Sequence, residues 1–496
     1  MSLVNNVKQF TVNQASKMII QLLAKSSSPQ ERLVQMCNIG EKMTDDPETL
    51  GAIDAVRKFL KSDHPAKALC DRVLNGIDQQ QRVRLFETLF LNAWFTGGPK
   101  RDAFEAEHGF RPPFIMIFSP TLHCNLRCKG CYTLGYGRRP EIELSLADDL
   151  ISQAEEMGIN FVSFLGGEPL MYPHLFDLIE GHPNVFFQCY TNATLLDEEK
   201  CQRFAKAGNV LMVVSIEGDE EETDSWRGPG VHKKIMAGFE MLNEAKVLTG
   251  ASATVTSQNA YKVGSMEFID KMVSRGVLAQ NYFLYIPVNG QADMNLMVTP
   301  EQRDNLRRVI IEARETRPMF FLDFWNDGPY VGGCIAGGRR YFHVNAKGDV
   351  EPCVYTHIAT DNIRDVPLAQ ALNSPLFQTI RDSQPHNTNQ LRPCMIIDNP
   401  EVMRRITSEC NCHFTHPGAE EVFTDLAEDM DAYAARWGKF ADKVWEEEYM
   451  SQPRWQAKFG SGGEGYPDWH NFQGPDERDG CRPVSQKELK AVRGQS

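Results

Sequence analysis

Three cysteines stand close together in the first half of the chain, at Cys124, Cys128 and Cys131. They directly follow a short apolar run that is typical of a strand, so they belong to a loop at the carboxyl end of that strand. Three thiolates in such a short loop can hold three corners of one compact 4Fe-4S cube. The fourth iron of the cube then has no protein ligand and can chelate the amino and carboxylate groups of a small molecule.

A zinc site is the alternative for the same segment, with His123 as a fourth ligand. Zinc sites usually present pairs of ligands that are separated by a longer insert. The triplet has spacers of three and then two residues, so the spacing favours the iron–sulfur cluster.

A second group of cysteines lies far along the chain. Cys334 is followed after 13 residues by Gly348, and four residues separate that glycine from Cys353. A hairpin with a bend at the glycine would bring both thiolates onto one side. The alternative is that these cysteines are unligated thiols that pack in the core, where free cysteine is common.

The elements that must position the triplet begin at Phe114, where short β-rich runs alternate with segments long enough for a helix. The predicted strands are 114–118, 161–165, 185–190, 210–216, 252–256 and 282–288, and the predicted helices between them are 144–157, 196–207, 232–245 and 261–275. This alternation predicts an α/β fold with a parallel sheet, either doubly wound or closed into an incomplete barrel. In both architectures the chemistry lies at the carboxyl ends of the strands.

Further polar and glycine motifs follow these predicted strands. Gly166, Gly167, Glu168 and Pro169 end the second strand. Two glycines let the backbone approach a ligand closely, and a glutamate places negative charge near an ammonium group. The alternative is an ordinary turn. Three other candidates follow later strands: Asn192, Ser215 and Arg227.

The triplet and these motifs together resemble the radical SAM superfamily, whose signature is Cys-x3-Cys-x2-Cys after the first barrel strand. The resemblance covers about residues 114–288 and implies a partial (β/α)6 TIM-like barrel. It implies that S-adenosylmethionine is bound through its amino group by 166–169, through its ribose by Ser215 and through its carboxylate by Arg227, with Asn192 as a further contact. Many members have an aromatic residue before the third cysteine, next to the adenine. This chain has Gly130 there, so Tyr132 is expected to take part of that role.

The spacing of Cys334, Gly348 and Cys353 is similar to the opening half of the SPASM and twitch auxiliary domains. A full SPASM domain would continue with Cys-x2-Cys-x5-Cys-x3-Cys, and this chain does not. We therefore expect one auxiliary 4Fe-4S cluster, with Cys394 as a third ligand and Cys412, or else Cys410, as a fourth. The other cysteines are assigned to packing: Cys37, Cys70, Cys189, Cys201 and Cys481.

The resemblance implies a function. A low-potential donor such as flavodoxin or ferredoxin reduces the cluster, S-adenosylmethionine is cleaved to a 5′-deoxyadenosyl radical, and the radical abstracts hydrogen from a substrate. Peptide, small-molecule and lipid-like substrates stay open; peptide-modifying relatives often carry a winged-helix module with strands, whereas residues 1–110 have helical spacing. The alternative is a non-catalytic, metal-stabilised binding or electron-transfer protein. No catalytic acid or base is singled out by spacing.

The whole chain of 496 residues is predicted to contain a helical N-terminal region (1–110), a core barrel (111–300), a small auxiliary-cluster domain (301–415) and a helical C-terminal extension with a tail (416–496). Its net charge of −14 disfavours nucleic acid as a partner. No apolar run approaches the roughly 20 residues of a membrane span. A cytoplasmic location is therefore expected.

Overall fold

A curled sheet of nine strands forms the centre of the protein, in the order β7-β6-β5-β4-β3-β2-β1-β8-β9. The computed structural model describes residues 29–42, 47–136, 140–288, 290 and 292–459. Neighbouring strands are parallel except for the antiparallel pair of β8 and β9. The strands are β1 (Ile115–Phe118), β2 (Phe161–Phe164), β3 (Phe186–Thr191), β4 (Val210–Ser215), β5 (Leu248–Val255), β6 (Ala279–Leu284), β7 (Phe320–Asp323), β8 (Tyr341–Val344) and β9 (Val350–Glu351).

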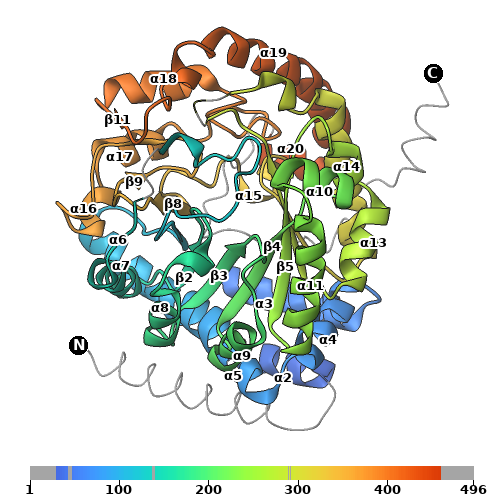
Figure 1. The fold of residues 1–496 in the computed structure, drawn as a ribbon. Coiled ribbons are helices and arrows are strands. Elements are labelled where there is room, and N and C mark those ends of the chain that lie inside the picture. The colour runs from blue at the N-terminus through green and yellow to red at the C-terminus, as the bar shows by residue number, and fades with distance from the viewer. Residues whose placement is uncertain (1–28, 43–46, 137–139, 289, 291, 460–496) are drawn as a thin grey trace, which may run out of the picture.

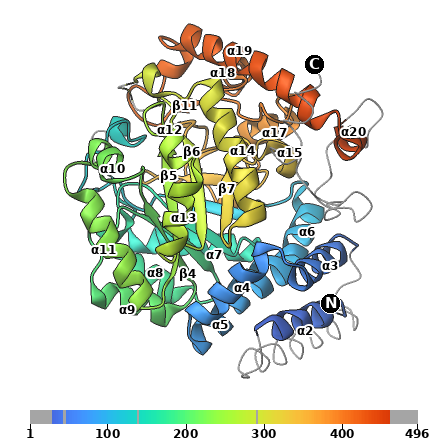
Figure 2. The ribbon, with the colours of Figure 1, turned by 90° about the vertical axis from the view of Figure 1, so that its right-hand side faces the viewer.

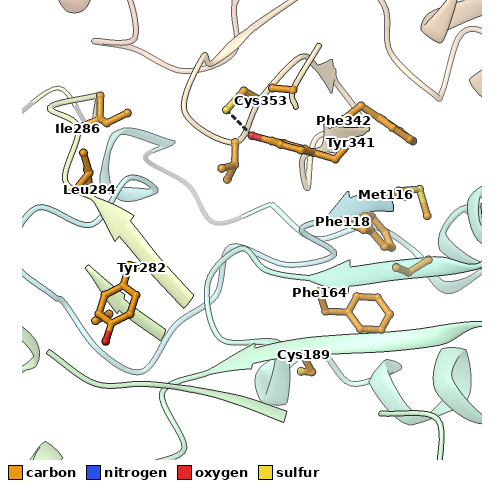
Figure 3. Close-up of a cluster of buried hydrophobic side chains, with 14 of the residues drawn as sticks. Met116, Phe118, Phe164, Cys189, Tyr282, Leu284, Ile286, Tyr341, Phe342 and Cys353 are labelled. Carbon is orange, nitrogen blue, oxygen red and sulfur yellow. Dashed lines mark hydrogen bonds between the residues drawn. The ribbon is translucent and has the colours of Figure 1, made fainter. Parts of the chain in front are cut away.

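Crossover helices cover the outer face of this sheet, as parallel strands require (Figure 1). They are α7 (Leu144–Glu156), α8 (Leu175–Gly181), α9 (Glu198–Ala207), α11 (Val231–Glu244), α13 (Met266–Ser274) and α14 (Pro300–Thr316). The short helices α10 (Glu220–Arg227) and α12 (Ala260–Val263) follow the carboxyl ends of β4 and β5. Alternate strand residues point outward into the core between sheet and helices. Met116, Phe118 and Phe164 are such residues, and all three are fully buried (Figure 3). The predicted α/β fold with a partial barrel is confirmed.

The sheet is larger than the six units that the sequence predicted. β6 starts three residues earlier than expected, because Gln280 and Asn281 are polar but completely buried. The hairpin expected between Cys334 and Cys353 is present as the antiparallel pair of β8 and β9, but β8 also pairs in parallel with β1 and so extends the main sheet. The His343 imidazole of β8 is buried, and it is paired with Ser119 Oγ at 2.7 Å and with Glu351 Oε2 at 2.6 Å. Buried polar side chains thus hid the start of β6 from the hydrophobic pattern.

The described part of the N-terminal region is helical, as expected, and lies in the lower part of both views (Figures 1 and 2). Its elements are α2 (Pro29–Gly40), α3 (Pro47–Lys61), α4 (Pro65–Gly76), α5 (Gln79–Leu85), the π-helical segment η1 (Phe86–Thr96) and α6 (Gly97–His108). Ile77 and Leu85 pack against Phe186 and Leu248 at the amino ends of β3 and β5. These helices therefore cover the amino end of the barrel.

A C-terminal layer closes the other end, at the top of both views (Figures 1 and 2). The segment predicted as a helical C-terminal extension contains α19 (Ala427–Val444), which buries Met430 and Trp437. The remaining described elements are η2 (Leu134–Tyr136), η3 (Pro169–Met171), η4 (Met294–Leu296), α15 (Gly328–Val331), β10 (Ile358–Ala359), α16 (Leu368–Leu372), α17 (Pro375–Asp382), α18 (Pro400–Glu409), β11 (His413–Phe414), η5 (Glu421–Phe423), η6 (Trp445–Tyr449) and α20 (Pro453–Phe459). Within the described ranges, no helix combines the length and the apolar character needed to cross a membrane.

A buried ion pair joins this layer to the barrel. Arg303 of α14 contacts Asp398 through two hydrogen bonds of 2.6 and 3.2 Å, and both side chains are fully buried. The guanidinium also lies over the ring of Trp437, at 4.1 Å from its centroid. Asp398 Oδ2 accepts a further hydrogen bond of 3.0 Å from the backbone N–H of Cys394. The pair thereby fixes the segment that carries a predicted cluster ligand.

Replacing Arg303 by leucine should destabilise the protein strongly, because it leaves the Asp398 carboxylate buried without its charge partner. We expect the apparent free energy of unfolding in urea to fall by about 3–5 kcal/mol. The matched control is Arg404→Leu on α18, whose ion pair with Asp431 is partly exposed and should contribute about 0–1 kcal/mol. Equal losses in the two variants would contradict this role of the pair.

Candidate active site

One continuous cavity of about 850 Å³ runs through the inside of the barrel. Cys124, Cys128 and Cys131 line it, and so do Cys334, Cys353 and Cys394. The two groups of cysteines are separated by more than 200 residues along the chain, yet they face the same space. The structure therefore brings together all the predicted ligands except Cys412.

The cysteine loop is held by backbone hydrogen bonds to helix α10 and to the loop after β2. Lys129 N–H donates to Trp226 O at 2.8 Å, and His123 O accepts from Glu168 N–H at 2.7 Å. Two side-chain donors face the sulfurs: Asn192 Nδ2 lies 3.9 Å from Cys124 Sγ, and Arg227 Nη1 lies 3.9 Å from Cys128 Sγ. Burial raises the pKa of the Cys128 thiol to about 12, and the charge of Arg227 opposes this effect. Such donors suit thiolate ligands of a cluster.

The glycine motif lies directly against the cysteine loop. A Cβ atom on Gly167 would lie 2.1 Å from His123 O, and one on Gly166 would lie 2.4 Å from Thr121 O. Gly166 also has a φ of 102°, which other residues rarely adopt. The sequence suggested that these glycines make room for a ligand. In the structure they make room for the loop that carries the cysteines.

Glu168 is buried and fully engaged with the end of β3. Its carboxylate accepts hydrogen bonds from Thr191 Oγ1 and Asn192 N–H, both at 2.7 Å, and from Leu170 N–H at 3.1 Å. Burial raises the pKa of Glu168, and these hydrogen bonds oppose the shift. Glu168 therefore positions Asn192, in addition to any charge it offers to a bound ammonium group.

The other predicted contacts of S-adenosylmethionine lie around the same end of the cavity. Ser215 lines it, with its Oγ 3.3 Å from Ser252 Oγ. Arg227 is held by Glu217 through Nε and through Nη2, the latter at 2.7 Å from Oε1. Tyr132 lines the cavity and its hydroxyl accepts from Gly166 N–H at 3.2 Å. Pro169 is buried at the start of η3 and is not among the described lining residues.

Two aromatic residues that were not predicted from the sequence explain why Gly130 stands where many radical SAM proteins have an aromatic residue. A Cβ atom there would lie 2.7 Å from Tyr285 Cε2 and 2.8 Å from Trp226 Cη2. Both rings line the cavity, with centroids 6.0 Å apart. They come from the end of β6 and from α10, so the spacing around the triplet gave no signal for them. Their rings occupy the position beside the third cysteine.

The second cysteine group is also held by nearby polar atoms. Tyr341 Oη lies 3.0 Å from Cys353 Sγ (Figure 3), and Cys394 Sγ accepts from Ile396 N–H at 3.4 Å. Burial raises the pKa of Cys353 to about 12 and also raises that of Cys394. Cys410 and Cys412 lie at the end of α18 and are not among the described residues that line the cavity.

The zinc alternative requires three or more ligands around a single ion. Among the described residues, no three side chains of histidine, cysteine, aspartate or glutamate converge in that way.

Comparison with known families agrees with this geometry. A model of the radical SAM superfamily matches residues 118–257, and a model of the SPASM iron–sulfur cluster-binding domain matches residues 334–395. The chain is a radical SAM enzyme. The first match contains the cysteine triplet and the second contains Cys334, Cys353 and Cys394.

Curated radical SAM relatives match slightly more than half of this chain. An AdoMet-dependent heme synthase of Methanosarcina barkeri is 26% identical over 303 residues, 55% of this chain and 86% of the relative. A PqqA peptide cyclase of Gluconobacter oxydans is 25% identical over 288 residues, 54% of this chain and 79% of the relative. The mycofactocin maturase MftC of Mycobacterium ulcerans is 26% identical, over 56% of this chain and 79% of the relative.

A solved structure supports the fold of this radical SAM enzyme. Streptococcus suis SuiB bound to the precursor peptide SuiA is similar with a TM-score of 0.52 and 19% identity, over 66% of this chain and 80% of SuiB. At this identity the likeness concerns the fold alone.

Replacing Gly167 by alanine should displace the cysteine loop of this radical SAM enzyme, because the new Cβ would collide with His123 O. After anaerobic reconstitution we expect the variant to bind about four iron atoms fewer per chain than the wild type. The matched control is Gly181→Ala in α8, where the nearest atom lies 4.0 Å from the new Cβ. Wild-type iron content in Gly167→Ala would contradict the close approach.

Proposed function

We propose that Cys124, Cys128 and Cys131 hold the 4Fe-4S cluster that cleaves S-adenosylmethionine, and that Cys334, Cys353 and Cys394 hold one auxiliary cluster. The observation that carries this proposal is that all six cysteines line one cavity. When bound, the first cluster and S-adenosylmethionine supply a 5′-deoxyadenosyl radical that removes hydrogen from a substrate carbon. The substrate is assigned to the same cavity.

The protein's own residues bind and orient the reactants. Glu217 occupies Nε and Nη2 of Arg227, so Nη1 is the nitrogen that is directed to the cysteine triplet and is available to a carboxylate. Glu168 holds Asn192 beside Cys124, and Ser215 offers a hydroxyl at the carboxyl end of β4. We assign to these residues and to Gly166 the contacts with S-adenosylmethionine.

Aromatic rings enclose the same end of the cavity. Trp226 and Tyr285 stand beside Gly130, and Tyr355 lies with its ring centroid 5.9 Å from that of Tyr132. These apolar surfaces keep water away from a reactive carbon radical, which is a requirement of such chemistry. Tyr132 is assigned a share of the adenine contact.

The auxiliary cluster is assigned three cysteine ligands, because Cys412 lies outside the described lining of the cavity. We also infer a low-potential electron donor such as flavodoxin or ferredoxin, and a cytoplasmic location. The free thiols of Cys189 and Cys201 agree with a reducing compartment. The predicted segments 1–110, 111–300, 301–415 and 416–496 are retained as the division of the chain.

The relatives suggest which substrate classes to consider. One is named as a peptide cyclase and another as a heme synthase, so peptides and small molecules are both represented. The alternative function, a non-catalytic electron-transfer or binding protein, would leave Ser215, Arg227 and Asn192 without a role around the triplet.

Anaerobic reconstitution with iron and sulfide, followed by reduction in the presence of S-adenosylmethionine, tests the proposed function. We expect 5′-deoxyadenosine and methionine to form, and Cys128→Ala to abolish both products. The matched control is Cys201→Ala, which removes a buried thiol of α9 outside the cavity. Uptake of zinc in place of iron, with S-adenosylmethionine left intact, would instead favour the non-catalytic alternative.

The auxiliary assignment has its own test by iron counting. The triple variant Cys334→Ala, Cys353→Ala and Cys394→Ala should lose about four iron atoms per chain. Cys412→Ala should keep the full iron content. If the single variant loses the iron and the triple variant does not, the assignment is wrong.

A further inference from the structure

The cavity continues well below the cysteines, through the barrel to the N-terminal helices. Inward residues of successive strands line it at several levels, since alternate residues of a strand share a face. On β2 these residues are Phe161 and Ser163, with Leu165 directly after the strand, and on β3 they are Phe186, Gln188 and Tyr190. Barrels of this kind usually fill their interior with layers of side chains. This barrel instead leaves a space that could hold a ligand.

The middle level of the cavity is polar. Ser163 is opposite Gln188 in the register of β2 and β3, and Asn281 is opposite Ser252 in that of β5 and β6. Ser163 Oγ donates to Gln188 Oε1 at 3.0 Å, and Asn281 Nδ2 donates to Tyr190 Oη at 2.7 Å. Asn281 Oδ1 is buried and has no hydrogen-bond partner. This level can therefore hold a polar group.

The lowest level is apolar and is lined by the N-terminal helices. The barrel contributes Phe161, Phe186, Leu211, Ala279 and Phe320. Helix α4 contributes Leu69 and Val73, and η1 contributes Phe86 and Leu89. Among the described lining residues at this end, Cys70 and Arg82 are the two whose side chains are not apolar. The Arg82 side chain donates a hydrogen bond to Asp78 O.

The apolar lining of the lowest level favours a hydrocarbon chain over a peptide as its ligand. A peptide would bring backbone N–H and C=O groups into a space whose walls are hydrocarbon, and unpaired buried groups of that kind are costly. A saturated chain has no such groups and gains from leaving water. Phe90 and Phe320, exposed by 46% and 55%, continue the apolar surface to the outside at this end.

We propose that the substrate of this enzyme is an amphiphile with a single long hydrocarbon chain. Its polar end lies at the level of Ser163, Gln188 and Asn281 and faces the cysteine triplet. Its chain occupies the lowest level, between the amino ends of the strands and helices α4 and η1. This assignment rests on the proposed function, because that function places the reacting atoms at the upper end of the cavity.

Binding of a dansyl-labelled fatty acid to the reconstituted full-length enzyme tests the proposal, with unlabelled saturated fatty acids of increasing length as competitors. We expect saturable binding below the concentration at which the probe forms micelles. Competition should strengthen with each added methylene and then reach a limit, because methylenes beyond the length of the cavity bury no further apolar surface.

Val73→Trp and, independently, Leu69→Trp fill the lowest level from α4. Each should weaken probe binding by roughly tenfold, the contribution of about two buried methylene groups, and should shorten the longest chain that competes. The matched control is Ala68→Trp, since Ala68 is an exposed residue of the same helix and should keep wild-type affinity.

The proposal is overturned if the wild type binds no probe below micelle formation, or if the correctly folded Val73→Trp and Leu69→Trp proteins bind as well as Ala68→Trp. Formation of 5′-deoxyadenosine by the wild type is measured in the same samples. If S-adenosylmethionine is cleaved but the probe does not bind, the amphiphile proposal is wrong and the proposed function is still supported. Probe binding with the expected variant pattern supports the chain site, whatever the yield of cleavage.

Discussion

The contact between the loops that follow β1 and β2 is the constraint on which the rest of the site depends. Gly166 and Gly167 press against the carbonyls of Thr121 and His123, so the second strand supports the backbone that carries the cysteine triplet. Glu168 extends the support to β3 by holding Thr191 and Asn192. Three consecutive strand ends are thereby held in one arrangement, which places the Asn192 side chain beside Cys124 Sγ.

A second constraint comes from the pairing of β8 with β1. Because Ile115 is in register with Tyr341, the segment that holds Cys334 and Cys353 is part of the barrel's own sheet. The buried pair of Arg303 and Asp398 brings Cys394 to the same side. The two cysteine groups share a cavity because the sheet continues past β1.

Much of this could be predicted from the sequence. The triplet, the glycine motif and the alternation of β-rich and helical segments indicated the barrel and the end at which its chemistry lies. The hairpin of β8 and β9 was expected, but the sequence could not reveal that β8 also pairs with β1, because that pairing joins segments far apart in the chain. It also could not reveal Trp226 and Tyr285 beside Gly130, since side chains far apart in the chain meet there only after folding. Cluster ligands can be predicted from their spacing along the chain, whereas the residues that line a cavity are known only once the chain has folded.

Because the interior of the barrel is open, the barrel is stabilised mainly by packing between the sheet and the helices around it. A barrel filled by layers of side chains is held from both faces of its sheet. Here the inner face borders a cavity, so cohesion comes from the outward residues, among which Phe118, Phe164 and Phe187 are completely buried. Evolution can therefore vary the inward residues of the middle and lowest levels to suit a new substrate while the scaffold keeps its shape. The hollow core makes the substrate site adaptable.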